Sequence, residues 1–498
     1  MYLCSKIHQK SKILKTIIKI FVLLTLVLPL HAQPPKHEIR AVWLTTIGGI
    51  DWPHSYATSP QTIRSQKQEL THSLDQLQQA NINTVLLQTR VRGTTIFPSG
   101  MEPWDGCLSG KPGTSPGYDA LQFAIEECHK RGMQCHAWIV TIPVGKWNTL
   151  GCKTLRQKYP KQIVKIGEEG YMNPEMSQTG DYLARFCEEV TQRYDIDGIH
   201  LDYIRYPETW KLKVSRSQGR TYITAIVRKI YDSVKALKPW VMVSCSPIGK
   251  YDDLPRYRSS GWNANTTVCQ DAQGWLRDGI MDALFPMMYF QGNNFYPFAI
   301  DWKEFSYGRI VAPGLAVYML HPKERNWGLD IIQREMHVLR QLNTGYAFFR
   351  SKFLTDNTKG IYSFTKDFNE YPALIPPMTW MGKRPPSAPR SLTIQRGMTA
   401  DRLAWSATRK SSQDEYLLYN VYASDQYPVD TEDATLLIAA RQTGSSLVVP
   451  HGGRTLHYAV TATDRYGNES APSYTPHTPS RSQRKIDFRQ LIIGKKRK

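Results

Sequence analysis

Cysteine is scarce and unpatterned in this sequence. Eight of the 498 residues are cysteine, and those beyond residue 100 are scattered: Cys107, Cys128, Cys135, Cys152, Cys187, Cys245 and Cys269. This odd, dispersed set argues against a disulfide framework, and no Cys-x-x-Cys or His-x-x-x-His spacing indicates structural zinc. A single bridge, for example Cys107 with Cys152, stays open because pairing is not readable from sequence.

Cofactor motifs are missing as well, and acidic residues are outnumbered. No glycine-rich phosphate fingerprint and no His-Glu metal constellation occurs, so we expect neither an organic cofactor nor a metal. Lys and Arg number 63 against 43 Asp and Glu, a net charge of +20. Such a charge attracts anionic partners. Because part of the excess lies in the two terminal segments, we do not expect nucleic-acid binding.

No hydrophobic run reaches the roughly 20 residues that a membrane-spanning helix needs. The longest, residues 20–30, follows a lysine-rich start and is followed by His31-Ala32-Gln33. A basic start, a short apolar stretch and a small residue at its end are typical of a secretory signal peptide. We therefore expect residues 1–32 to be removed. The mature chain would have no transmembrane segment and would be exported, to the periplasm or beyond the cell.

From Ile39 onward, short β-branched or aromatic runs alternate with segments of helical apolar spacing, the pattern of repeated β-α units. The expected strands are Ile39–Thr45, Thr84–Thr89, Gln134–Val140, Gly198–Tyr203, Val241–Ser246, Ala283–Tyr289, Ile310–Tyr318 and Gly345–Phe349. The expected helices include Gln61–Ala80, Asp119–Arg131, Gln178–Tyr194, Arg220–Leu237 and Asp330–Leu342. This predicts an α/β fold, a (β/α)8 TIM barrel over residues 33–375.

The pattern changes after the barrel. Residues 376–388 are rich in proline and break both periodicities, so we expect a linker. Short alternating strands separated by turn residues follow over 389–478 and resemble a fibronectin type III sandwich. Trp405 and Tyr458 would then belong to its core. Residues 479–498 form a basic tail, for which we expect no fixed structure.

The fourth β-α unit carries the most informative polar residues. In Gly198-Ile199-His200-Leu201-Asp202, strand alternation would turn His200 and Asp202 toward the barrel interior. Asp202 then ends the strand, at the edge where barrel enzymes carry their active sites. A carboxylate there suits glycoside hydrolysis. Arg205 follows closely and would keep Asp202 ionised, which favours a nucleophile or base over an acid.

Several motifs in the same order resemble the bacterial glycosyl-hydrolase-like family, a family-ten-like group of barrels. They are Ile39-Arg40-Ala41-Val42-Trp43, Asn83–Gln88, Phe97-Pro98-Ser99 with Pro103-Trp104, Gly117-Tyr118-Asp119, His136-Ala137-Trp138 and Asp197–Pro207. The resemblance implies a glycosidase acting on a polysaccharide or a peptidoglycan-type glycan. It also implies a catalytic role for Asp202. One departure is Met287, which follows Pro286 where many members have glutamine.

The second carboxylate has two candidates. Glu102 lies in the long loop after the second strand and matches an acidic position common in the family. Asp271 begins the helix after the fifth strand, where an aspartate is often only a helix cap. Sugar rings also need aromatic platforms and hydrogen-bonding groups. The expected substrate contacts are Gln88, Arg90, Trp104, His136, Trp138, His200, Arg205, Tyr206 and Tyr289.

Two functions follow from these observations. The first is an exported glycosidase that uses two carboxylates and hydrolyses O-glycosyl bonds of an oligosaccharide or polysaccharide, with peptidoglycan glycan strands as one such substrate. The alternative is a noncatalytic glycan-binding or cell-envelope scaffold protein, because a fold can persist without its chemistry.

Overall fold

The computed structural model describes residues 34–257, 259, 261–407 and 417–476. From Pro35 onward these residues belong to one compact unit. The expected signal peptide, residues 1–32, and the expected basic tail, residues 479–498, lie outside the described residues. Within the described part of the chain, no helix is both long and apolar enough to cross a bilayer.

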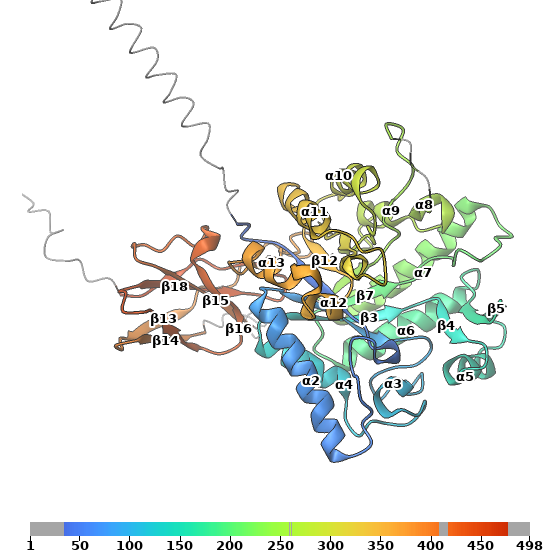
Figure 1. Ribbon diagram of the computed structural model, residues 1–498, viewed down its shortest axis with the longest axis horizontal. Helices are drawn as coiled ribbons and strands as arrows, with labels where there is room; N and C mark the ends of the chain where they lie inside the picture. Colours follow the sequence, from blue (N-terminus) through green and yellow to red (C-terminus); the bar gives the residue numbers. More distant parts are fainter. Residues whose placement is uncertain (1–33, 258, 260, 408–416, 477–498) are drawn as a thin grey trace, which may run out of the picture. The chain divides into compact units, whose positions relative to one another are not determined.

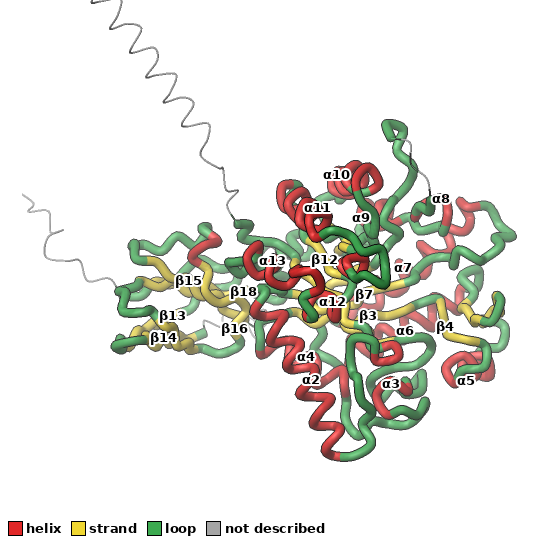
Figure 2. The backbone as a smooth tube through the Cα atoms, in the orientation of Figure 1, coloured by secondary structure: helices red, strands yellow, loops and turns green. Residues whose placement is uncertain are grey.

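A parallel sheet forms the centre of the larger part of the fold (Figures 1 and 2). Its strands lie in the order β10-β9-β8-β7-β3-β2-β1-β12-β11. Their bounds are β1 Arg40–Leu44, β2 Thr84–Arg90, β3 Gln134–Val140, β7 Gly198–Asp202, β8 Met242–Cys245, β9 Ala283–Leu284, β10 Ile310–Val311, β11 Gly314–Leu315 and β12 Tyr346–Phe348. All the expected strand positions are therefore occupied, although several strands are shorter than expected.

The sheet curls until its two edges meet in one stretch of chain. Strand β10 pairs with β9, whereas β11 pairs with β12, and only Ala312 and Pro313 separate β10 from β11. Ala312 donates its amide to Leu284 on one side, and Ala347 donates its amide to Pro313 on the other. The expected strand Ile310–Tyr318 breaks here because Pro313 has no amide hydrogen to donate. The result is a TIM-barrel-like parallel sheet.

The five expected helices surround this sheet in Figure 2, each within a few residues of its predicted bounds. They are α2 Pro60–Gln79, α4 Ala120–Lys130, α6 Ser177–Arg193, α7 Arg216–Leu237 and α11 Leu329–Gln341. In α2, Ser59 caps the first turn and proline takes the first helical position, while Leu70, Leu74 and Leu77 are buried. Local capping and the apolar stripe thus specify the same helix.

Shorter elements lie in the connections. The helices are α3 Gly106–Ser109, α5 Leu150–Lys158, α8 Ala264–Thr267, α9 Ala272–Arg277, α10 Tyr296–Glu304, α12 Ser351–Thr355 and α13 Ile361–Phe368. The 3-10 turns are η1 Ile47–Gly49, η2 Gly292–Asn294, η3 Val317–Leu320, η4 Thr358–Gly360 and η6 Ala434–Leu436. A small antiparallel sheet that the sequence did not reveal follows β3, formed by β4 Pro143–Lys146, β5 Ile163–Ile166 and β6 Glu169–Met172.

The C-terminal part is all β. One antiparallel sheet contains β13 Arg390–Gln395, β14 Ala400–Ser406 and β17 Ser446–Pro450. The other contains β15 Leu418–Ser424, β16 Leu437–Gln442, β18 His457–Thr463 and β19 Ser473–Tyr474. Trp405 and Tyr458 are buried in the cluster between these sheets, as expected of core residues. The Trp405 ring packs edge-on against Tyr419, at a centroid distance of 5.4 Å.

The proline-rich segment 376–388 has no regular structure, but it is packed. Met378 is buried and donates its amide to the carbonyl of Tyr466. Trp380 donates its indole Nε1 to Asp282 at 2.8 Å and lies against the Arg309 guanidinium. The segment is therefore part of a packed floor under the amino ends of the strands and not a free spacer.

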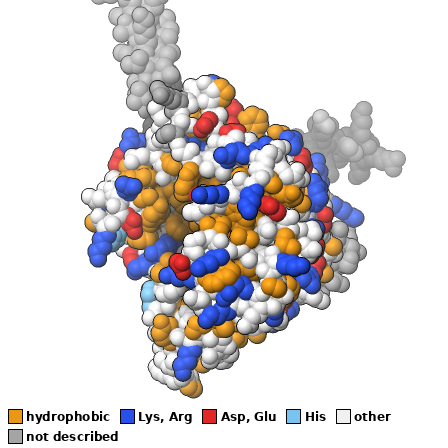
Figure 3. All heavy atoms as spheres, turned by 90° about the vertical axis from the view of Figure 1, so that its right-hand side faces the viewer, with side chains coloured by type: hydrophobic (Ala, Val, Ile, Leu, Met, Phe, Trp, Pro, Cys, Tyr) orange, Lys and Arg blue, Asp and Glu red, His pale blue; other side chains and the backbone are white. Residues whose placement is uncertain are grey.

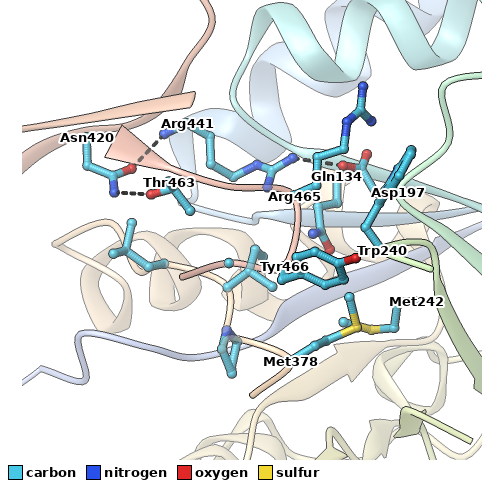
Figure 4. A pocket seen from close by; sticks show the side chains of 14 residues that line it. Gln134, Asp197, Trp240, Met242, Met378, Asn420, Arg441, Thr463, Arg465 and Tyr466 are labelled. Carbon is cyan, nitrogen blue, oxygen red and sulfur yellow. Dashed lines mark hydrogen bonds and ion pairs between the residues drawn. The ribbon is translucent and has the colours of Figure 1, made fainter. Parts of the chain in front are cut away.

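Charged contacts add to this floor (Figure 4). Asp197, one residue before β7, accepts hydrogen bonds from Arg441 of β16 at 2.8 Å and from the amide of Cys135 at 2.9 Å, and its other ion-pair partner is His129. Arg465 pairs with Asp195 at 2.7 Å. Arg441 lowers the pKa of Asp197 against the opposing effect of burial, so this carboxyl group is held ionised. These contacts give Asp197 a structural role.

The seven cysteines of the described part are all buried free thiols. Cys107 and Cys152 are among them, so the bridge that the sequence left open between these two residues is not formed.

Candidate active site

Asp202 ends β7 inside the mouth of the barrel-like sheet. The side chains of β7 alternate as predicted. Ile199 and Leu201 pack in the outer core, which is the apolar cluster shared with the surrounding helices, while His200 and Asp202 point inward. One oxygen of Asp202, Oδ2, accepts a hydrogen bond from the indole of Trp138 at 3.1 Å. The other, Oδ1, accepts from the Ser246 hydroxyl at 2.9 Å and from the Tyr203 amide at 2.8 Å. Three donors thus hold one carboxyl group.

Burial and hydrogen bonding act on Asp202 in opposite directions. Burial raises the pKa of this carboxyl group, and the hydrogen bond from Ser246 and the charge of Arg205 lower it, with burial the larger effect. Arg205 therefore acts in the expected direction without deciding the outcome. Its guanidinium is bound elsewhere, since it pairs with Glu208 at 2.5 Å and lies over the Tyr203 ring at 4.4 Å.

The backbone beyond Asp202 turns sharply. Tyr203 has a φ of 53°, which is in the left-handed region that residues with a side chain seldom occupy. This turn points the amide of Tyr203 back at Asp202 and places the carbonyl of Tyr203 where Arg205 donates to it. Backbone strain of this kind is common at functional sites.

Aromatic side chains line the mouth around Asp202. Tyr289, Tyr318 and Phe349 contact one another with centroid distances of 5.4 to 5.8 Å, and each is partly exposed. Asp202 and Tyr203 both act electrostatically on Tyr289, which places these groups near one another. Figure 3 shows a face of the molecule that is hollowed and lined by hydrophobic side chains, with lysine and arginine prominent around it. Such partly exposed rings are the surfaces that sugar faces contact.

The histidines predicted as substrate contacts lie below this mouth and are fully buried. His200 accepts a hydrogen bond from the Trp43 indole at 3.1 Å and interacts with Ser244 through Nδ1. Burial lowers the pKa of His200 well below its ordinary value and that of His136 to about 4, so both rings are neutral. They are interior packing residues and not substrate contacts. Trp138, which was also predicted as a substrate contact, donates its indole hydrogen bond to Asp202.

Glu102, one candidate for the second carboxylate, is buried and not exposed at the mouth of the barrel-like sheet. Its side chain has no exposed surface and pairs with Arg90 through three contacts of 2.7 to 3.0 Å. Tyr182 donates its hydroxyl to the same carboxylate at 2.8 Å. Arg90, also fully buried, further donates to the carbonyls of Val140 and Thr141. The catalytic role of Glu102 and the substrate contact of Arg90 are corrected: the two residues form a buried structural pair.

Asp271 caps the short helix α9. Its side chain accepts a hydrogen bond from the amide of Gly274 at 3.2 Å and from the Tyr251 hydroxyl at 2.5 Å. Both contacts are structural, as the helix-cap interpretation predicted.

Of the remaining predicted substrate contacts, Tyr289 lies at the mouth near Asp202, whereas the others make structural contacts. Gln88 accepts hydrogen bonds from the amides of Thr46 and Ile47 and so braces the connection after β1. Tyr206 is buried and packs against Trp210. Trp104 is partly buried against the outer core. Tyr289 alone among the predicted aromatic contacts belongs to the exposed wall near Asp202.

Sequence reasoning missed Ser246, Tyr318 and Phe349. Ser246 closes the expected strand Val241–Ser246 and alternates with Ser244 toward the interior, so its position carried the signal. Tyr318 and Phe349 likewise end the seventh and eighth expected strands. Reading the last residue of every barrel strand as a candidate would have found all three.

A TIM-barrel-like sheet with a hydrogen-bonded aspartate and partly exposed aromatic rings at its carboxyl edge is typical of a carbohydrate-active barrel protein. Residues 38–319 match the family described as "Glycosyl hydrolase-like 10", and the chain belongs to this family.

Two relatives that are named as glycosyl hydrolases align with the chain, one over most of its length and the other over about half. "Glycosyl hydrolase YngK" of Bacillus subtilis is 28% identical over 487 residues, which span 89% of this chain and 94% of the relative. "Glycosyl hydrolase DigH" of Escherichia coli K12 is 30% identical over 298 residues, which span 52% and 67%. Among solved structures, the glycoside hydrolase domain of PgaB (BpsB) from Bordetella bronchiseptica is 13% identical, with a TM-score of 0.45 and coverage of 67% of this chain and 98% of that one.

Proposed function

We propose that the protein is an exported glycoside hydrolase that acts on a polysaccharide or peptidoglycan-type glycan, with Asp202 as nucleophile or base. The observation that carries the proposal is the environment of Asp202, which accepts three hydrogen bonds beside a partly exposed aromatic wall. These hydrogen bonds orient the carboxyl group and favour its ionised form, while burial is the larger effect and raises its pKa. Membership of the glycosyl hydrolase-like family supports the same reaction class.

The reaction needs a second carboxyl group to protonate the leaving oxygen. Glu102 and Asp271 are held in structural contacts, so neither is free for this role. Glu208 lies on the loop that follows Asp202, with a side chain that is 20% exposed, and its charge acts on Tyr203. It pairs with Arg205, so it would have to exchange this partner for the leaving group. We propose Glu208 as the carboxyl group to test beside Asp202.

The experiment compares the mature protein with its Asp202→Asn and Glu208→Gln variants. Release of reducing ends is measured on a panel of bacterial glycans that includes murein strands freed of peptide. A loss of at least about a hundredfold in Asp202→Asn, with unchanged thermal stability, is expected of a group that acts in the chemical step. Equal activity of Asp202→Asn and the parent protein would mean that the chemistry lies elsewhere.

A noncatalytic glycan-binding or cell-envelope scaffold is the second candidate. The structural contacts of Glu102 and Asp271 favour the scaffold function. They leave neither of the two carboxylates that the sequence suggested free to act as the second catalytic group. Binding without product on every glycan of the panel, by the parent protein and by Asp202→Asn alike, is the result expected of a scaffold.

Two finer assignments belong to the same proposal. Residues 389–478 would be a fibronectin type III-like sandwich, supported by a three-stranded and a four-stranded antiparallel sheet around the buried Trp405. Export rests on the basic and apolar segments before Gln33. N-terminal sequencing of the protein from its natural host tests export, and a chain that begins at Gln33 is the expected result.

A further inference from the structure

A second hollow opens at the carboxyl end of the strands. It has a volume of about 410 Å³ and lies between the connections that follow β1, β2 and β3. Tyr56, Arg92 and Lys146 contribute side chains to its lining, and glycines contribute much of the remaining wall. Active sites of barrel proteins are built from these same connections.

The charged groups in this hollow are unbalanced. Asp105 is engaged on both oxygens, since Oδ1 accepts from the amide of Cys107 at 2.8 Å and Oδ2 from the Thr94 hydroxyl at 2.6 Å. Arg92 and Lys146 are exposed, and neither side chain has a hydrogen-bond or ion-pair partner among the residues that the structure describes. Two positive charges therefore face a cavity whose one lining carboxylate is already bound.

Arg92 also links the hollow to Asp202. Burial raises the pKa of the Tyr203 hydroxyl and the charge of Asp202 raises it further, whereas the charges of Arg205 and Arg92 lower it. Arg92 therefore lies within electrostatic reach of the residue that directly follows Asp202. A glycan bound across the mouth at Asp202 could extend toward Arg92.

The hollow also offers an apolar surface of the right kind for a sugar ring. Tyr56 is 58% exposed although it lies in the cavity wall. A Cβ atom added at Gly110 would come within 3.0 Å of the Tyr56 ring, so the ring lies close against the backbone there. Gly110 has a φ of 78°, which also favours glycine. The Tyr56 ring is thus held against one wall with much of its surface open.

We propose that this hollow is a subsite for a sugar unit that carries a carboxylate, with Arg92 and Lys146 binding the carboxylate and Tyr56 contacting the ring. The proposal deepens the proposed function and rests on it, because it names a substrate feature that the same mouth selects. Guanidinium and ammonium groups form charge-assisted hydrogen bonds with carboxylates, and the planar guanidinium can do so in a bidentate way. Arg92 would then make the substrate contact that the sequence predicted for Arg90, two residues earlier.

The test uses two matched pairs of ligands. Peptide-free murein strands and polygalacturonate oligosaccharides are each compared with the same material after reduction of the carboxyl groups to alcohols. Binding is measured by calorimetry on the Asp202→Asn protein, so that hydrolysis does not consume the ligand. We expect the acidic member of at least one pair to bind about tenfold more tightly than its reduced counterpart.

Variants then locate the effect. Arg92→Gln and Lys146→Gln should each remove most of this preference, and Arg92→Lys should restore part of it. The matched control is Lys153→Gln, which makes the same charge change at an exposed lysine of α5 outside the lining. It should keep the preference, and it should respond to salt as the parent does, whereas the preference itself should fall at high ionic strength.

The outcomes separate this proposal from the proposed function. Equal affinity for acidic and reduced glycans, absence of binding in all four cases, or an equal loss in Lys153→Gln would overturn the subsite. Reducing-end release by the protein that carries the native Asp202 is scored independently. Hydrolysis of reduced glycans at an undiminished rate would leave the glycosidase standing while the carboxylate subsite fails.

Discussion

The buried pair of Arg90 and Glu102 gives the sharpest test of the structure. The sequence predicted a catalytic Glu102, whereas the structure makes it the partner of a fully buried guanidinium. In Glu102→Leu, Arg90 would retain the carbonyls of Val140 and Thr141 as acceptors but would lose its counter-charge. Removing one member of a buried ion pair costs about 3–5 kcal/mol, because the other charge stays buried. We expect the free energy of unfolding to fall by that amount.

The matched variant is the double replacement of Arg90→Met with Glu102→Leu. Because it removes both charges, it should recover most of the lost stability, since apolar replacements of a buried pair are often neutral. Urea unfolding followed by tryptophan fluorescence measures all three proteins, and reducing-end release is recorded on the folded fraction. We expect the double variant to keep activity within about tenfold of the parent. A Glu102→Leu protein of parental stability that has lost activity as fully as Asp202→Asn would refute the structural assignment.

Three further results are expected. Ser246→Ala removes a donor that lowers the pKa of Asp202, so the acidic limb of the pH–rate profile should move to higher pH, with roughly tenfold lower activity near that limb. Glu335 is fully buried, and neither of its carboxylate oxygens has a hydrogen-bond partner among the described residues. Burial raises its pKa, so Glu335→Leu should stabilise the fold by about 1–3 kcal/mol at neutral pH and by less in acid, as denaturant titration would show. Because the pKa of Asp197 is lowered, its contribution to stability is fully present above pH 3.8 and is lost progressively as the pH falls below that value. Asp197→Ala should therefore flatten the loss of stability in acid, as measured by denaturant unfolding at a series of pH values from neutral to well below 3.8.

Much of the barrel-like part could be predicted because its local signals agree with its packing. The strand Gln134–Val140 was predicted to the residue, since it lies at the centre of the sheet with all of its residues buried. The helix Pro60–Gln79 followed from its apolar stripe and was missed by one residue at each end. The expected strand Ala283–Tyr289 ends at Leu284 instead, because Pro286 cannot donate to a neighbouring strand.

The site was less predictable because contacts distant in sequence decide it. Their position at the end of the second strand predicted that Gln88 and Arg90 lie at the mouth, but the pairing of β2 with β3 shifts register between these two residues. Both side chains are instead bound by groups elsewhere in the chain, which the sequence does not reveal. The inward direction of Asp202, by contrast, depends only on the alternation within β7.

The packed proline-rich segment decides how this protein can be divided. A chain cut after Pro376 would remove Met378 and Trp380, and with Trp380 one of the hydrogen bonds to the buried Asp282. It would also leave Asp197 without Arg441 and expose Ile375 and the apolar side chains next to it. A barrel fragment that ends where the sequence pattern changes would thus have an uncovered hydrophobic end, prone to aggregate. A stable fragment needs the proline-rich segment and the β-sheets that follow it.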